Sequence, residues 1–390
     1  MVKEVQKNGG LPIKIWTDFV EESAMEQAYN LSMHPRSFSH IALMPDVHAG
    51  YGMPIGGVVA FDNAISPNSV GVDIGCGIIF AKTGLRVDDT PSNVIENVVE
   101  GIRMEIPTGF NHRDRPHKEW MPKNFDLDSM PIVKKEWESA AHQIGTLGGG
   151  NHFIELQVDK NGEICVMIHS GSRNIGKKVA DFYIDIARDL NIKTGEEIPS
   201  KWDLAYLETD SVYMKQYLLE MDFCLAFAEA SRTVMKWLIE LTFNEEVGPT
   251  YFYDIIDVHH NYVNKETHFG KDVWVHRKGA TAAAKGQMGI IPGSQGTSSY
   301  IVSGKGNEDS FSSCSHGAGR KMGRKEAKRS LVLEDEIKML DEKGIIHGIR
   351  NVSDLDEAPS AYKDIDSVMK FQEDLVAIEN TLTPLAVVKG

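Results

Sequence analysis

The segment Gly71-Val72-Asp73-Ile74-Gly75-Cys76-Gly77 is a glycine-rich turn that leads directly into the apolar run Ile78–Thr83. The run is short and rich in β-branched and aromatic residues, which predicts a buried strand. Glycine allows positive φ angles and lets a ligand approach the main chain closely. The carboxylate of Asp73 and the thiolate of Cys76 could therefore share a metal site, in which the thiolate bridges two ions. A turn-forming aspartate beside a small buried cysteine is the simpler explanation of this pair taken alone.

Strands and helices alternate along the whole chain. Short apolar runs beside Gly, Pro and Asp predict further strands at Ile13–Trp16, Ile41–Met44, Val58–Phe61, His152–Val158, Ile164–His169, Tyr251–Val258, Val273–Val275 and Leu385–Val388. Apolar residues at helical spacing predict helices from Pro91 to about Glu105 with Thr90 as the N-cap, and at Asn174–Leu190, Glu208–Phe243 and Ser367–Thr381. The alternation is too irregular for a doubly wound sheet, so we expect a mixed α/β fold of the α+β class.

The composition is that of an ordinary globular protein. The 390 residues are 42% hydrophobic and 25% charged with a net charge of −15, which excludes a disordered or collagen-like chain. The negative charge argues against a protein that coats nucleic acid or rests on an anionic membrane. Four cysteines are too few for a disulfide framework, and no segment has the pattern of a secretory signal or a membrane span. We therefore expect a cytoplasmic protein without a membrane partner.

Three histidines follow or end predicted strands beside glycine-rich turns. They are His152, His169 and His260. A lone histidine is more often structural than a ligand. Together with Asp73 and Cys76, however, the three would form a mixed O/N/S donor set that suits a catalytic divalent ion better than a closed structural zinc site. A metal site and a set of separate structural roles both remain open at this point.

Two segments carry arginines where phosphates could bind. Arg173 precedes a predicted helix whose first N–H groups could bind a phosphate, although an ordinary cap with a solvated arginine explains it equally well. His316-Gly317-Ala318-Gly319-Arg320 is predicted to open a second, basic helix with positions 320, 324 and 328 on one face. Residues 320–329 hold six basic residues and one acidic residue, and either a phosphate-bearing polymer or solvent could face them. His316 itself could act as a base or as a nucleophile.

Six glycine-containing motifs occur in one order along the chain, followed by two short terminal motifs. They are Pro45–Gly52, Gly71–Gly77, Gly148–His152, His169–Arg173, Pro292–Gly296, His316–Arg320, Ala361–Asp364 and Val387–Gly390. In this order they resemble the RtcB family of RNA-splicing ligases, and the resemblance extends from about Ile13 to Gly390. It implies one catalytic domain over residues 1–390, with β-sheets surrounded by helices around one deep cleft. We also expect a monomer. Protein partners are not predicted.

The resemblance also implies two manganese ions. Cys76 would bridge them, His169 and His260 would complete one ion, and Asp73 and His152 would complete the other. His259 remains an alternative to His260 as the metal ligand.

The implied reaction joins an RNA 3′-phosphate or 2′,3′-cyclic phosphate end to a 5′-hydroxyl end, in RNA repair or tRNA splicing. His316 would attack the α-phosphorus of GTP and form a histidine–GMP adduct, and the GMP would pass to the RNA 3′-phosphate. The carboxylate of Asp46, in the Pro-Asp-Val-His motif, could orient or deprotonate that imidazole, although it could also be a turn aspartate.

The same resemblance implies the binding residues. GTP would contact Asn151, His152, Phe153, Glu155, His260, Asn261, Pro292, Gly293, Ser294, Gln295, Ser299, Gly317, Ala318, Gly319, Tyr362 and Lys389. Among these, Glu155, Tyr362 and Lys389 would read or stack on guanine. RNA phosphates would contact Arg173, Arg320 and Arg324.

Two other functions stay open from the residues. A metal-dependent phosphoesterase that only opens cyclic phosphates would need the metal ligands but no guanine pocket. A non-catalytic RNA-binding subunit would need the basic segment but neither the metal ligands nor His316.

Overall fold

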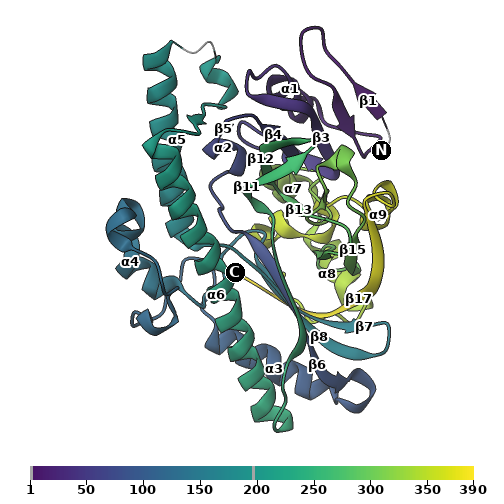
Figure 1. The fold of residues 1–390 in the computed structure, drawn as a ribbon. Coiled ribbons are helices and arrows are strands. Elements are labelled where there is room, and N and C mark those ends of the chain that lie inside the picture. The colour runs from purple at the N-terminus through teal and green to yellow at the C-terminus, as the bar shows by residue number, and fades with distance from the viewer. Residues whose placement is uncertain (1–2, 196–197) are drawn as a thin grey trace.

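Two large β-sheets form the centre of the computed structural model, which describes residues 3–195 and 198–390 (Figure 1). The first sheet has the order β1 (Lys3–Val5), β2 (Ile13–Ile15), β3 (Ser37–His48), β4 (Ile55–Phe61), β12 (Lys271–Lys278) and β11 (Asn261–His268). The second has the order β10 (Tyr253–His259), β6 (Gly77–Arg86), β8 (Glu163–Ser170), β7 (Phe153–Asp159), β17 (Val376–Lys389), β15 (Ser299–Gly304) and β14 (Met288–Ile291). Neighbouring strands are antiparallel except β2 and β3, which run parallel.

Strict alternation of side chains explains why the second sheet is covered on both faces. In β6, Ile79 and Ala81 join the core on one face, whereas Ile78 and Phe80 join a separate core on the other. Because successive residues of a strand point to opposite faces, a continuous apolar run serves two cores at once. On the first of these faces the sheet packs against helices α3 (Ser92–Glu105) and α6 (Val212–Val247).

Helices also cover both faces of the first sheet. Helix α1 (Glu22–Ser32) contributes apolar side chains to the core on one face, and α9 (Ile365–Phe371) contributes them to the core on the other. The mixed α/β class and the arrangement of sheets surrounded by helices are therefore confirmed.

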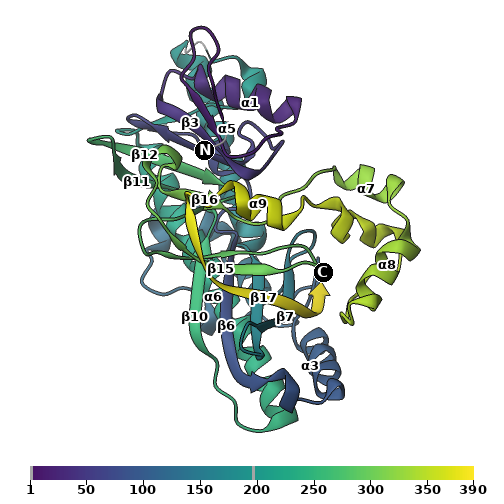
Figure 2. The ribbon, with the colours of Figure 1, turned by 90° about the vertical axis from the view of Figure 1, so that its right-hand side faces the viewer.

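The remaining elements lie around the two sheets. Helices α2 (Pro67–Val70), α4 (Pro131–Gln143) and α5 (Arg173–Thr194) share a helical core with α6, and α5 and α6 run along one side of the molecule (Figure 1). Helices α7 (Arg324–Ser330) and α8 (Leu333–Glu342) project to one side of the sheets (Figure 2). Two small sheets pair β5 (Ala64–Ile65) with β9 (Leu207–Glu208) and β13 (Ala280–Ala282) with β16 (Ser313–Ser315). No helix in the described ranges combines the length and apolar character needed to span a bilayer.

The predicted helix Ser367–Thr381 is wrong in its second half. Helix α9 ends at Phe371, and the chain from Val376 onward is strand β17, which pairs with both β7 and β15. The apolar spacing that resembles a helix is overridden by pairing with strands that are distant in sequence. The helix predicted to begin at Pro91 is confirmed, but Pro91 and not Thr90 occupies the N-cap position.

Candidate active site

A cavity of about 530 Å³ opens where the two sheets and the C-terminal segments meet. The histidines His169 and His316 reach its wall. Most residues predicted to bind the nucleotide or the RNA also line it, namely Asn151, Phe153, Glu155, Pro292, Gly293, Ser294, Gln295, Gly317, Ala318, Gly319, Arg320, Arg324, Tyr362 and Lys389. The structure thus brings together segments that lie more than two hundred residues apart in the chain.

His316 follows β16 and is held by a buried carboxylate. Its backbone N–H donates to Asp46 Oδ2 at 3.0 Å, and its Nδ1 lies 2.6 Å from the same oxygen. Asp46 belongs to strand β3 and is fully buried, so it is not a turn aspartate. Gly319 allows the chain after His316 to pack closely against the backbone of Asp46, because a Cβ at its φ of +73° would lie only 2.3 Å from the Asp46 carbonyl oxygen.

The charge of Asp46 is maintained by its surroundings. Burial acts to raise the pKa of this carboxyl, but the charge and hydrogen bond of His316, followed by the charge of Lys363, lower it below its usual value. Lys363 reaches the same strand by donating to the carbonyl oxygens of Pro45 and Val47. When the imidazole of His316 is neutral, an ionised Asp46 holds its single ring proton on Nδ1, which leaves the Nε2 lone pair free.

The predicted metal donors converge beside this pair. His169 Nε2 lies 3.2 Å from Cys76 Sγ and 3.3 Å from His260 Nε2. His152 Nε2 lies 3.4 Å from the same thiol and 3.5 Å from Asp73 Oδ2. The donors form two sets that share Cys76, one with His169 and His260 and the other with Asp73 and His152.

Strand pairing explains this convergence. Cys76 directly precedes β6, whose second residue pairs with His169 of β8, and β10 ends beside β6 just before His260. Gly171 is also required, because a Cβ there would lie 2.5 Å from Asp73 Oδ1. Three neighbouring strand ends therefore carry the donors to one point.

The residues fit a divalent transition metal. Thiolate, imidazole and carboxylate donors together match such ions. His169 is oriented for ligation, because its Nδ1 lies 3.1 Å from the Asn151 carbonyl oxygen while its Nε2 faces the Cys76 thiol. The Nδ1 atoms of His152 and His260 are buried without a hydrogen-bond partner in the part of the chain that the structure describes. His259 turns away, with Nδ1 3.2 Å from the Gly75 carbonyl oxygen. The geometry therefore places His260 and not His259 in the donor set.

Glu155 of strand β7 also lines the cavity. Its side chain is buried, and Oε2 accepts from Gln157 Nε2 at 2.8 Å. Oε1 has no hydrogen-bond partner among the described residues. Burial raises the pKa of Glu155 to about 8, against the smaller opposing effects of Gln157 and Lys389. The free oxygen is therefore an acceptor available to a ligand.

Glu357 is a site residue that the sequence analysis missed. Its Oε1 accepts from Arg320 Nη1 at 3.2 Å and from Arg324 Nε at 3.0 Å. Its Oε2 accepts from the Tyr362 hydroxyl and from Lys389 Nζ, the latter at 3.4 Å. Because one carboxylate holds three cations, any phosphate that binds the arginines has to compete with it. No local pattern around Glu357 indicates this role.

The predicted basic helix begins later than expected. Helix α7 starts at Arg324, whereas Arg320 forms an isolated β-bridge with Tyr362. The prediction that positions 320, 324 and 328 share one helical face is therefore wrong. Gly319, with a φ of +73°, is in a conformation that a helix does not contain, and Arg320 and Arg324 meet through Glu357 instead.

Five predicted binding residues do not reach the cavity wall. Two of them, His152 and His260, belong to the metal-donor sets beside it. Ser299 is buried and its hydroxyl accepts from Gln157 Nε2 and the Gly293 N–H. The side chain of Asn261 bonds to backbone atoms of Asp73 and Gly279. The guanidinium of Arg173 donates to the Gly109 carbonyl oxygen at 2.6 Å and to Thr146 Oγ1 at 3.2 Å.

Burying an ionisable group reduces the stability of the folded state, and such groups cluster at sites where a protein carries out chemistry. The cavity, with a carboxylate–imidazole pair next to two metal-donor sets, marks the chain as an enzyme.

Comparison with known proteins shows the family. The family model described as tRNA-splicing ligase RtcB matches residues 27–138 and 123–390. The chain is 40% identical to the RNA-splicing ligase RtcB of Escherichia coli strain K12, with 97% of each chain covered. It is 32% identical to the tRNA-splicing ligase RtcB of Nanoarchaeum equitans, covering 99% of this chain and 97% of that protein. The chain belongs to the RtcB family of ligases.

Proposed function

We propose that the protein is a GTP- and Mn(II)-dependent RNA ligase that joins 3′-phosphate or 2′,3′-cyclic phosphate ends to 5′-hydroxyl ends, in RNA repair or tRNA splicing. The observation that carries the proposal is His316, whose Nδ1 is engaged by buried Asp46 on the wall of the cavity where both donor sets meet. The membership of this protein in the RtcB family supports RNA ligase activity.

The imidazole of His316 starts the reaction. Its Nε2 lone pair attacks the α-phosphorus of GTP, an N–P bond forms, and the bond to the β-phosphate breaks to release pyrophosphate. An oxygen of the RNA 3′-phosphate then displaces the histidine and takes over the GMP. In the last step the 5′-hydroxyl attacks the RNA 3′-phosphorus, loses its proton, and GMP leaves. A cyclic phosphate end is first hydrolysed to the 3′-phosphate.

The metal ligands follow from the two donor sets. Cys76 would bridge two Mn(II) ions, with His169 and His260 on one and Asp73 and His152 on the other. Bound there, Mn(II) would polarise the phosphates and neutralise the charge that develops on them. Glu155 would accept from guanine, Tyr362 and Lys389 would complete the base site, and Arg173, Arg320 and Arg324 would bind RNA phosphates.

The organisation of the protein follows from the same site. We infer that residues 1–390 act as one catalytic domain, because the cavity draws on segments from β3 to β17. We further infer a monomer in a reducing cytoplasm, which suits the free thiols of Cys76, Cys165, Cys224 and Cys314.

A labelling experiment tests the proposal. The protein is incubated with Mn(II) and α-³²P GTP, then with RNA that carries a 3′-phosphate and a 5′-hydroxyl. We expect an acid-labile, alkali-stable adduct and a joined product, with ATP giving neither. Absence of an adduct in the wild-type protein would overturn the proposal, and opening of cyclic phosphates without GTP or joining would identify a phosphoesterase instead.

Asparagine at position 46 should slow the first step strongly. Both hydrogen bonds from His316 go to one carboxylate oxygen, which an amide oxygen can replace, but the amide removes the charge that stabilises the imidazole as it becomes cationic. Losses of about 100-fold or more are typical when such assistance to proton transfer is removed. Single-turnover labelling measures this rate constant, with bound Mn(II) as the internal control. A rate within twofold of wild type would remove Asp46 from the mechanism.

GTP affinity should rise with pH through the ionisation of Glu155. The pKa of this carboxyl is about 8 in the free protein, and only the ionised form can accept both N–H groups of guanine. Binding therefore releases a proton, and affinity should increase by up to about tenfold per pH unit below pH 8 and level off above it. Titration calorimetry measures this dependence. The variant Glu155→Gln should bind GTP weakly, and its affinity should not depend on pH. A pH-independent affinity of the wild-type protein would contradict the assignment of Glu155.

A further inference from the structure

A buried arginine lies behind the strand that leads to His316. Arg277, in β12, is 1% exposed in its side chain, and its Nη1 and Nη2 pair with the two carboxylate oxygens of Glu266 in the neighbouring strand β11. His268 supports the same carboxylate, with Nε2 2.9 Å from Glu266 Oε2. A two-pronged pairing of this kind fixes the plane of the guanidinium as well as its charge.

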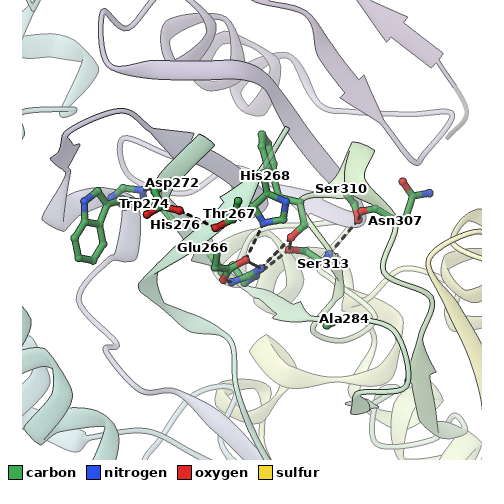
Figure 3. A network of polar contacts seen from close by, with 12 residues as sticks. Glu266, Thr267, His268, Asp272, Trp274, His276, Ala284, Asn307, Ser310 and Ser313 are labelled. Atoms are coloured by element: carbon green, nitrogen blue, oxygen red, sulfur yellow. Dashed lines mark hydrogen bonds and ion pairs between the residues drawn. The ribbon is translucent and has the colours of Figure 1, made fainter. Parts of the chain in front are cut away.

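The rest of the guanidinium faces the segment before β16. Arg277 Nε donates to Ser313 Oγ at 2.9 Å, and Nη2 donates to the Phe311 carbonyl oxygen at 2.9 Å. Figure 3 shows Glu266, His268 and Ser313 close together in this network. Arg277 therefore joins β11 to the first residue of β16.

The two contacts enclose a strained turn. Phe311 and Ser312 have φ angles of 51° and 49°, in the left-handed region that residues with a Cβ rarely adopt. Backbone strain of this kind persists only when the surroundings hold it in place. The Phe311 ring stacks on His40 at a centroid distance of 4.3 Å, and Arg277 binds the backbone on one side of Ser312 and the side chain on the other.

Only the short strand β16 separates this turn from His316. Strand β16 covers only Ser313–Ser315, and Ser315 pairs with Ala280 of β13. An extended strand advances by about 3.3 Å per residue, so a shift of the turn is passed along the chain. The next residue is His316, whose backbone N–H is bound by Asp46.

We propose that Arg277 is a positioning residue for the reaction of His316. It holds the left-handed turn at Phe311 and Ser312, and through β16 it sets the place and direction of the imidazole. This inference rests on the proposed function, which gives His316 its role as nucleophile. A displacement of about 1 Å at a reacting group can cost about 100-fold in rate.

The variants Arg277→Lys and Ser313→Ala test this proposal. Lysine keeps the charge beside Glu266 but cannot hold both Ser313 and Phe311. We expect Arg277→Lys to lower the single-turnover rate of His316 labelling about 30- to 100-fold, with the KM for GTP and bound Mn(II) within twofold, as removal of an interaction specific to the transition state requires. Ser313→Ala should lower the rate about fivefold, because one of the two contacts remains.

Two further variants separate positioning from stability. Ser312→Gly relieves the left-handed strain at one of the two positions, so in the Arg277→Lys background it should restore at least about fivefold of the lost rate. Val273→Ala removes buried apolar volume from the same strand β12. It should lower the melting temperature and leave the labelling rate within twofold.

A second readout keeps this inference distinct from the proposed function. The proton between Asp46 and His316 should give a far-downfield NMR resonance, assigned by its loss in Asp46→Asn. We expect Arg277→Lys to shift or broaden it. If the wild-type protein forms no adduct, the proposed function fails while this resonance still tests the positioning. An unchanged labelling rate and an unchanged resonance in folded Arg277→Lys would overturn the inference. If Arg277→Lys does not fold, the same two measurements on Ser313→Ala test the inference instead.

Discussion

Alanine in place of His316 should leave no covalent nucleotide on the protein. In the wild-type protein Asp46 engages Nδ1 at 2.6 Å, so Nε2 is the nitrogen with a free lone pair. A methyl group has no lone pair to offer, and the N–P bond cannot form. Incubation with α-³²P GTP and Mn(II), followed by denaturing electrophoresis, should show no labelled band, and RNA with a 3′-phosphate should remain unjoined.

The same variant should still complete the last step. In the proposed mechanism His316 acts only in the transfer of GMP, so an RNA whose 3′ end already carries a diphosphate-linked guanosine needs no nucleophile from the protein. His316→Ala should therefore seal such an RNA to a 5′-hydroxyl end. A labelled band of wild-type intensity would refute the assignment of the nucleophile. His142→Ala, which removes a half-buried imidazole from helix α4, is the matched control and should label normally.

Alanine in place of Cys76 should abolish every step. The thiol belongs to both donor sets, so its removal takes a ligand from each, whereas loss of His260 or Asp73 affects one set only. Metals at a phosphoryl centre contribute several kcal/mol, so labelling and joining should fall by about 1000-fold or more. Metal analysis after dialysis should find little Mn(II) in Cys76→Ala and about half the wild-type amount in His260→Ala.

A buried cysteine elsewhere in the same sheet provides the control. Cys165 in β8 is fully buried in the core of the second sheet and lies outside both donor sets. Cys165→Ala should retain bound Mn(II) and labelling within a few fold of wild type. Retention of two Mn(II) ions by Cys76→Ala would exclude the thiol as a shared ligand.

Strong local patterns predicted most of the fold. The run Ile78–Thr83 is apolar on both faces, and the structure places it in β6 between two cores. The pattern failed at Ser367–Thr381, because β17 is stabilised by β7 and β15 and not by its own apolar spacing. Val387, for example, pairs with Glu155, which lies more than two hundred residues away in sequence.

The basic segment shows the same limit at the site. Its composition left open whether a phosphate-bearing polymer or solvent faces these cations, and Arg320 and Arg324 do reach the cavity. The structure places Glu357 between the two arginines of this segment, Arg320 and Arg324, and Lys389 from the C-terminal strand β17. Because a carboxylate more than thirty residues from either arginine supplies the counter-charge, local charge patterning could not predict it.

The sequence by itself determined which chemical groups are available. Asp73, Cys76 and the histidines are metal donors wherever they lie, and His316 is a potential nucleophile, because protonation and ligand preference belong to the side chain. The tertiary structure alone decided that Cys76 is common to both donor sets, that Asp46 leaves Nε2 of His316 free, and that Arg277 holds the turn before it. These are distances and directions, and they are set by strand pairing and burial between segments that the chain brings together only on folding.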